Sequence, residues 1–296
     1  MLGILVFLAS QNLIVSISLL SPSVTIFTLW FVPALCGCSS VDDYLVAVRD
    51  LPQAEASASP RNHPSRDTLR TSVTVGKQTR TPVPKFREGT KATECLGRVY
   101  VDLCGPMAVV SHTHNLYLMN IIDDFSSYIW CIPLRSKSDA FSSLQTWHKA
   151  VTVQTGNTLR ILVTNNGELV SNAMRVWCNT LGINHQLTAP RTSAQNGRIE
   201  RLHRMILGKA CTMRIACNTP GSLWDEFCLT TVHLTRLTAA TANQGRTPYQ
   251  LWFGWLPSLS HLREIGCNAY ALHTPSPSKI YARSLPCILI GYAPPL

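Results

Sequence analysis

The hydrophobic pattern changes twice along this chain of 296 residues, and each change marks an expected boundary. Residues 1–41 contain no charged side chain and hold two apolar stretches, at residues 1–20 and 24–38. Residues 50–92 are instead rich in Ser, Thr, Pro, Arg and Lys. Proline at this density removes backbone donors and fixes φ, so this stretch predicts a linker. From about residue 98 the pattern becomes that of a folded domain.

Strand-like and helix-like segments alternate in this folded part. Short apolar runs that end in turn residues predict strands, and apolar positions at helical spacing predict helices. The expected strands are residues 98–103, 116–122, 128–134, 159–163 and 183–187. The expected helices are residues 138–153, 170–181, 197–217 and 222–239. Their order predicts a mixed α/β fold with helices on both faces of the sheet.

The same pattern predicts helix ends and buried faces. Ser138 is the expected N-cap of the first helix, and Gly156 and Gly182 are expected to end the first two helices. One apolar stripe on each of the first three helices is expected to face the core. These stripes are Phe141, Leu144, Trp147 and Val151; Met174, Trp177, Cys178 and Leu181; and Ile199, Leu202, Ile206, Ala210 and Met213.

Composition narrows the class of protein only partly. A hydrophobic fraction of 46% with 14% charged residues is not that of a disordered chain. Lys and Arg number 26 against 16 acids, a net charge of +10, which suits a polyanionic partner and equally a soluble basic protein. The 11 cysteines form no C-x-x-C pair. Cys104, Cys131, Cys178 and Cys228 are therefore expected to be small buried side chains in a reducing compartment.

Three interpretations of residues 1–41 remain open from the sequence. The stretch is long enough to approach a membrane span of about 20 residues. It also resembles a poor secretory signal, although it lacks the basic n-region. The third interpretation is sequence foreign to the domain that follows. Hydropathy does not separate these three interpretations.

Three positions in the folded part have the chemistry of a strand-end site. Asp102 lies near the end of the first expected strand, Asn165 follows the fourth, and Glu200 lies in the first turns of the long helix. Taken singly, each has an ordinary structural explanation. A lone Asp at a strand end usually caps a turn, and a Glu early in a helix usually serves its dipole.

The order of several motifs makes a functional interpretation more specific. The first four motifs are Val101–Met107, Ile122–Trp130, Leu162–Glu168 and Ala189–Arg201. The later ones are Trp224, Thr247–Trp252, Leu262–Cys267 and Ile290–Tyr292. In order and spacing these motifs together resemble copia-type retrotransposon integrases, over residues 95–292, which is about two-thirds of the chain.

This resemblance implies an α/β fold with a ribonuclease H-like mixed five-stranded sheet flanked by helices, followed by a partial small β-barrel of the Src-homology-3 type. The expected division of the chain has four parts. They are an apolar segment at 1–41, a linker with a remnant of a zinc module at 42–94, an integrase catalytic core at 95–245 and the partial barrel at 246–296.

The resemblance also implies polynucleotidyl transfer with two Mg²⁺ ions. Such ions lie about 3.5–4 Å apart and clamp the attacking and leaving oxygens. In the family, the acid that matches Asp102 bridges both ions, and the acids that match Asn165 and Glu200 each hold one. An amide at 165 brings no negative charge, and the stretch also lacks a glycine that the family has after Gly167.

We therefore expect a degenerate integrase domain with little strand-transfer activity and a weakened magnesium site. An active Mg²⁺-dependent integrase is the alternative from the enzyme class. A membrane-tethered interaction protein, anchored through residues 1–40, is the alternative from the binding class. The resemblance implies a location in the nucleus and, if the protein is functional, a homo-oligomer. The apolar start instead leaves a membrane location open.

The implied partner is DNA, both the element ends and the target. The residues expected to contact it are Arg191, Gln195, Asn196, Arg198, Arg201, Arg204 and Lys209. No zinc is expected, because Arg70 and Val73 stand near the places where the family's zinc module has cysteines, and His63 is the only histidine nearby.

Overall fold

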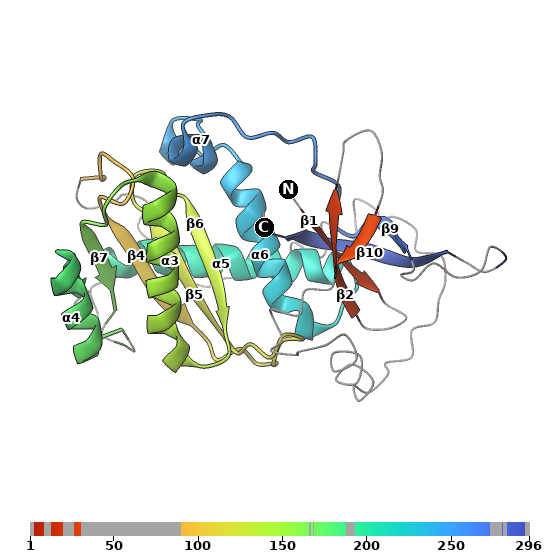
Figure 1. Cartoon of the computed structure of the whole chain (residues 1–296), viewed down its shortest axis with the longest axis horizontal. Helices are drawn as coiled ribbons and strands as arrows, with labels where there is room; N and C mark the ends of the chain where they lie inside the picture. Colours follow the sequence, from red (N-terminus) through yellow and green to blue (C-terminus); the bar gives the residue numbers. More distant parts are fainter. Residues whose placement is uncertain are drawn as a thin grey trace. The chain divides into compact units, whose positions relative to one another are not determined.

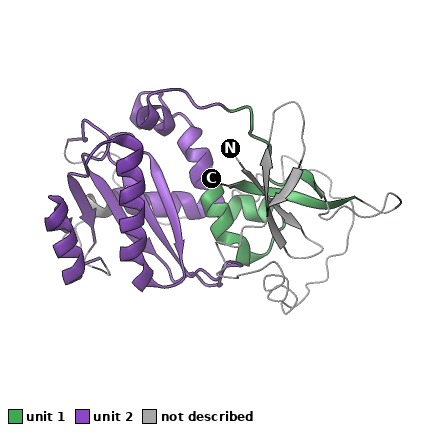
Figure 2. Ribbon diagram, in the orientation of Figure 1, with its two compact units in different colours: residues 1–76, 211–230, 259–296 green, residues 77–210, 231–258 purple. Residues whose placement is uncertain are grey.

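The computed structural model describes residues 90–165, 167, 169–187, 193–272, 280 and 283–293, together with three strands within the first 30 residues. Only the backbone is described for those three strands and for residues 193–196, 272 and 293. The chain divides into two compact units, shown in different colours in Figure 2. Unit 1 consists of residues 1–76, 211–230 and 259–296, and unit 2 of residues 77–210 and 231–258.

A mixed five-stranded sheet is the centre of unit 2, as the sequence predicted (Figure 1). Its strands lie in the order β6-β5-β4-β7-β8. They are β4 (Val99–Cys104), β5 (Tyr117–Asp123), β6 (Ile129–Leu134), β7 (Ile161–Thr164) and β8 (Asn184–Leu187). β4 pairs antiparallel with β5, which pairs antiparallel with β6, whereas β4, β7 and β8 run parallel.

Helices cover both faces of this sheet, which confirms the predicted α/β layers. α3 (Ala140–Thr155) and α4 (Asn172–Leu181) contribute Leu144, Trp147 and Met174 to a core that includes Val101 and Ile121 of the sheet. The first part of α5 (Ser193–Ala216) covers the other face with the buried Ile199, Leu202, Ile206 and Ala210. In Figure 1, α3 lies in front of the sheet and α5 runs behind it.

Three local predictions were wrong. Ser136, not Ser138, is the capping residue: it forms a capping box with Asp139 around the short 3₁₀ turn Lys137–Asp139 that precedes α3. Ser136 has the extended backbone that an N-cap needs, and its hydroxyl accepts the N–H of Ser138. Leu181 is 46% exposed, since it is the last residue of α4 and lies outside the buried stripe. α5 begins at 193, not at 197.

The glycine predictions and most of the stripes were correct. Gly156 and Gly182 end α3 and α4 with φ values of 68° each, in the left-handed region that favours glycine. Phe141, Trp177 and Met213 are half-buried, while the other predicted core positions apart from Leu181 are buried.

The later segment of unit 2 packs against the β5–β6 hairpin. α6 (Trp224–Leu237) spans both units, and its Arg236 donates from Nε to the carbonyl of Ile129 at 2.6 Å. The guanidinium of Arg236 also lies 4.6 Å from the ring centroid of Tyr128. In α7 (Pro248–Phe253), Trp252 stacks on Tyr128 with 5.4 Å between ring centroids. These contacts attach residues 231–258 to the sheet that carries the strand-end residues.

Unit 1 contains a second sheet, of order β3-β2-β1-β10-β9. Its strands are β1 (Gly3–Leu8), β2 (Leu13–Leu19), β3 (Phe27–Trp30), β9 (Asn268–Leu272) and β10 (Ser284–Ala293). Two of the later sequence motifs meet here, because the Tyr292 hydroxyl donates to the carbonyl of Arg263 and accepts from its N–H, both at 2.8 Å. A side chain at Gly291 would collide with Thr230, whose hydroxyl donates to the carbonyl of Ile290 at 3.0 Å.

The apolar start of the chain thus supplies β1, which pairs antiparallel with β10. Within the described part of the chain, no helix is long and apolar enough to cross a membrane. Of the expected linker with its zinc-module remnant at 42–94, residues 42–89 lie outside the described residues. The expected boundaries at 41, 94 and 245 stay a prediction.

Most described cysteines behave as the sequence suggested. Cys131, Cys178 and Cys228 are buried cysteines outside any disulfide, and Cys104 is half-buried. Burial raises the pKa of the Cys178 thiol to about 11, which makes it a poor nucleophile at neutral pH.

Candidate active site

Parallel pairing of β4 with β7 brings two of the predicted site residues together. The register places Tyr100 beside Val163 and Val101 beside Thr164. The next step of that register puts Asp102 beside Asn165, where β7 has just ended. The two residues are 63 positions apart in the chain, yet they share the carboxyl edge of the sheet.

The side chains of Asp102 and Asn165 are directly hydrogen-bonded. The amide Nδ2 of Asn165 donates to Oδ1 of Asp102, which also accepts the N–H of Leu103 at 2.9 Å. The other end of the amide, Oδ1 of Asn165, accepts the N–H of Gly167 at 3.1 Å. Because the backbone N–H of Gly167 can only donate, this contact places the amide oxygen beside Gly167 and directs the NH₂ group toward Asp102.

The carboxylate of Asp102 lies in a nearly closed environment. The residue is only 6% exposed, so its charge needs donors close by. Its influence reaches Cys104, where burial first and the charge of Asp102 second raise the pKa of the thiol. The charge of Asp102 therefore influences its neighbours at the end of β4.

Glu200, the third predicted acid, occupies a different kind of position. It lies on the exposed side of α5, between the buried Ile199 and Arg201, which is also exposed. Among the described residues it makes no hydrogen bond or ion pair with Asp102 or Asn165. The structure thus brings two of the three predicted residues into contact and leaves the third on a solvent-facing helix surface.

A fourth polar residue, which sequence reasoning missed, belongs to the same row across the sheet. Asn120 of β5 is the antiparallel partner of Asp102 and is 1% exposed. Within the described part of the chain neither its amide nitrogen nor its amide oxygen has a hydrogen-bond partner. The signal was present, because an Asn in the apolar run Leu118–Ile122 is unusual for a buried strand.

Two neighbouring acids at the end of β5 are structural. Asp123 accepts from the N–H of Leu96 at 2.9 Å and from the N–H and hydroxyl of Ser126 at 2.7 and 2.6 Å. Burial raises the pKa of Asp123, opposed by these donors and by the charge of Arg198. Asp124 accepts the N–H of Ala92 at 2.7 Å.

The ion pair between Asp124 and Arg198 fixes the start of α5. Arg198 contacts Asp124 through Nη1, and its Nη2 donates to the carbonyls of Asp123 and Asp124, both at 3.3 Å. It also lies over Tyr100, 5.7 Å from the ring centroid. Since the carboxylates of Asp123 and Asp124 are used within the fold, neither is free to replace the acid missing at 165.

The residues expected to contact nucleic acid divide into three groups. Arg201, Arg204 and Lys209 are exposed on α5. Arg198 is turned inward to Asp124, with 20% of its side chain exposed. Arg191 and the side chains of Gln195 and Asn196 lie outside the described residues.

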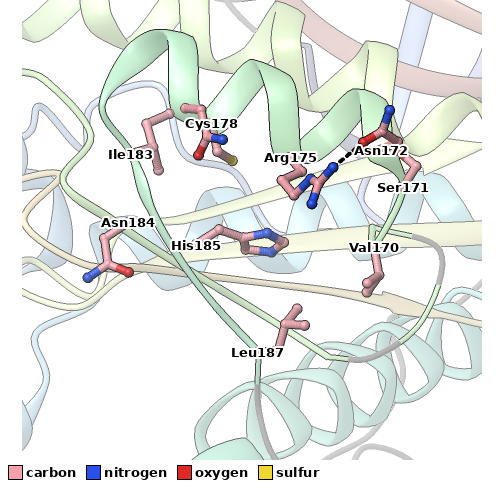
Figure 3. A pocket seen from close by; sticks show the side chains of 10 residues that line it. Val170, Ser171, Asn172, Arg175, Cys178, Ile183, Asn184, His185 and Leu187 are labelled. Atoms are coloured by element: carbon pink, nitrogen blue, oxygen red, sulfur yellow. Dashed lines mark hydrogen bonds between the residues drawn. The ribbon is translucent and has the colours of Figure 1, made fainter.

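A pocket of about 620 Å³ opens between α4 and β8, close to the end of β7 (Figure 3). The Thr164 hydroxyl and Nε2 of His185 lie 2.8 Å apart beside it. Arg175 donates to Oδ1 of Asn172 at 2.8 Å on the helix side, as the dashed line shows. Burial lowers the pKa of His185. The pocket therefore combines one cation with neutral hydrogen-bonding groups and the apolar Val170 and Leu187.

The donor set at the strand ends does not fit a pair of magnesium ions. Mg²⁺ binds through hard, preferably anionic oxygens, and two ions need several of them. Asp102 is one such ligand, but the Asn165 amide is neutral and both of its polar atoms are already hydrogen-bonded. Among the residues that the structure describes, no three His, Cys, Asp or Glu side chains gather to hold a metal.

Comparison with known proteins places this site in a family. Residues 93–193 match the family described as the integrase core domain. This segment belongs to the integrase core domain family. The matched segment includes β4 and β7, and with them Asp102 and Asn165. Its predicted kinship with retrotransposon integrases is confirmed by two plant relatives.

The first relative is the retrovirus-related Pol polyprotein from transposon TNT 1-94 of Nicotiana tabacum, which is 34% identical over 220 residues. These residues cover 73% of this chain and 16% of that polyprotein. The Pol polyprotein from transposon RE1 of Arabidopsis thaliana is 27% identical over 213 residues, covering 71% of this chain and 14% of its own length. The chain thus spans about one-sixth of the polyproteins it matches.

A solved structure is also similar to part of the chain. The HTLV-2 integrase catalytic core domain in complex with magnesium, in its trimeric form, aligns with a TM-score of 0.42 and 15% identity. The alignment covers 54% of this chain and 99% of that domain.

Proposed function

We propose that the integrase core of this chain acts as a nucleic-acid-binding domain with little or no strand-transfer activity. The observation that carries this proposal is Asn165, which stands where the resemblance places the second acid and donates to Asp102. A charge paired with a dication stabilises a site by several kcal/mol even when it is screened. Because each ~1.4 kcal/mol is a tenfold change in rate, loss of that charge slows transfer by orders of magnitude.

Binding of DNA does not need the missing acid. Arg201, Arg204 and Lys209 are exposed cations on α5, the helix that also carries Glu200. Cations of this kind contact phosphates and release counterions without reading the base sequence. The net charge of +10 favours the same class of partner. We therefore propose DNA, as element ends and target, as the partner, with a nuclear location and self-association as in other integrases.

The roles of the site residues follow from their contacts. Arg198 holds the start of α5 against the β5–β6 corner, so that the exposed cations and Glu200 lie on an anchored helix. Among the described residues at the ends of β4 and β7, Asp102 is the one acid, and Asn165 donates to its carboxylate. Magnesium, when bound in an integrase that has all its acids, supplies the electrostatic stabilisation of the transferring phosphate.

A strand-transfer assay on labelled oligonucleotides in Mg²⁺ tests the proposal. The unaltered chain should give product near background, and Asn165→Asp should raise product at least tenfold because it restores the charge, on the order of 1.4 kcal/mol or more. The control is the double variant Asp102→Asn with Asn165→Asp. It has the restored acid at 165 but lacks the acid at 102, so it should give product near background. If the unaltered chain and the revertant are equally active, and both well above the Asp102→Asn control, the chain is instead an active Mg²⁺-dependent integrase.

A further inference from the structure

We propose that the Asn165 amide takes the place of the metal ions at the strand ends, so that the folded chain needs no divalent cation to hold Asp102. This inference rests on the proposed function, because it concerns the same two residues. It goes further in assigning to Asn165 a positive structural role, in which the amide acts as an internal counter-group for a buried carboxylate.

The geometry supports this role at both ends of the amide. One end donates to Oδ1 of Asp102, and the other accepts the N–H of Gly167 at 3.1 Å. Gly167 is two residues beyond Asn165, so the loop after β7 itself sets the orientation of the amide. The N–H of Leu103 is a second donor to Oδ1 of Asp102, at 2.9 Å. Both polar atoms of the amide therefore have a hydrogen-bond partner within the chain.

Charge explains why the side chain at this position matters. With an acid at 165, two carboxylates would face each other at the ends of neighbouring strands. One of them, Asp102, is only 6% exposed, so water would screen the repulsion little. Like charges that close disfavour each other, and a cation between them relieves the repulsion. With Asn165 the same space holds an N–H donor and a carboxylate, which attract without an ion.

A cation between the two side chains would compete with this arrangement. An ion bound between Oδ1 of Asn165 and Oδ1 of Asp102 would compete with the Gly167 N–H for the first oxygen and with the amide N–H for the second. The gain would be one anionic ligand and one neutral one, which is a poor exchange for an ion as strongly hydrated as Mg²⁺.

Thermal unfolding of the full chain, followed by circular dichroism, tests this without DNA. The unaltered chain should have the same unfolding midpoint in EDTA and in Mg²⁺ at up to about 10 mM. The EDTA samples contain NaCl that matches the ionic strength of the Mg²⁺ samples. Asn165→Asp should lower the midpoint in EDTA by roughly 3–8 °C, because a charge-assisted hydrogen bond is replaced by repulsion. Mg²⁺ should restore this loss in a saturable manner.

The matched control exchanges the two groups. The double variant Asp102→Asn with Asn165→Asp keeps one amide and one carboxylate, so it should unfold within about 2 °C of the unaltered chain and remain indifferent to Mg²⁺. If Asn165→Asp does not fold in EDTA but folds when Mg²⁺ is present during refolding, the proposal is equally supported.

Two results would overturn the inference. One is a saturable rise of the unaltered chain's midpoint with Mg²⁺, and the other is an Asn165→Asp variant as stable in EDTA as the unaltered chain. Neither depends on strand transfer, so failure here and failure of the proposed function are separate outcomes. An inactive chain whose stability follows Mg²⁺ would remove the inference and leave the proposed function in place.

Discussion

Arg198 reaches from the first turns of α5 to the fully buried carboxylate of Asp124, at the corner between β5 and β6. The same guanidinium donates to the hydroxyl of Ser127 at 3.2 Å. A residue that the sequence suggested as a phosphate ligand is thus part of the fold's interior. It links the helix that carries Glu200 to the hairpin beside the strand that carries Asp102.

We expect Arg198→Ala to destabilise unit 2 strongly. Removing one partner of a buried ion pair leaves Asp124 charged and short of a donor, at a cost of roughly 3 kcal/mol in the free energy of unfolding. Urea unfolding measures it. Arg204→Ala on the exposed side of the same helix is the matched control and should change that free energy by less than about 0.5 kcal/mol. Equal effects of the two substitutions would argue against the anchoring role.

DNA binding should depend on the exposed cations of α5. Arg204→Ala should weaken binding to a labelled duplex and reduce the steepness of the log–log salt dependence by about 0.9, the value for one phosphate contact. Fluorescence anisotropy at several NaCl concentrations gives both quantities. Lys149→Ala removes an exposed cation from α3, on the other face of the sheet, and should leave the slope unchanged. A salt response that is flat in the unaltered chain would contradict backbone contacts altogether.

Acid should destabilise the chain partly through His203 of α5. Burial lowers the pKa of this imidazole from 6.5 to about 4, and its Nε2 has no hydrogen-bond partner among the described residues. The folded state thus keeps His203 neutral, so its contribution to stability is present above pH 6.5 and is lost as the pH falls toward 4.

His203→Leu should therefore lose less stability than the unaltered chain over that interval. The difference between the two unfolding free energies should grow on acidification to on the order of 3 kcal/mol. Urea unfolding of both proteins at about pH 7, 6, 5 and 4 gives this difference and spans the interval in which a shifted His titrates. The other titrating groups are common to both proteins, so their contributions largely cancel in the difference. A difference that does not vary with pH would rule out His203 as the titrating group.

Asn120→Val should stabilise the chain. The buried amide has no partner within the described residues, so a branched apolar side chain in this central strand removes an unsatisfied group at little cost in packing. We expect the free energy of unfolding to rise by about 1–2 kcal/mol. Asn120→Ser, which keeps a polar group and leaves a gap, should not stabilise. A loss of stability in Asn120→Val would mean that a bound water satisfies the amide.

Sequence reasoning worked best where a pattern repeats. The order of strands and helices, the buried stripes of Leu144, Trp147 and Val151 on α3, and the glycine ends at Gly156 and Gly182 were all predictable, because period and left-handed backbone are local properties. It failed at Ser138 and Leu181, where the outcome depends on a neighbouring turn or on the last residue of a helix.

The sequence alone determined which chemical groups the chain carries and in what order. It placed Asp102, Asn165 and Glu200 in their motifs, and it showed that the middle one has no charge. The tertiary structure alone decided what these groups touch. Parallel pairing of β4 with β7 sets Asn165 against Asp102, and the β5–β6 corner binds Arg198 through Asp124. Such contacts join residues 63 and 74 positions apart, and only the packing of the sheet and α5 brings them within hydrogen-bonding distance.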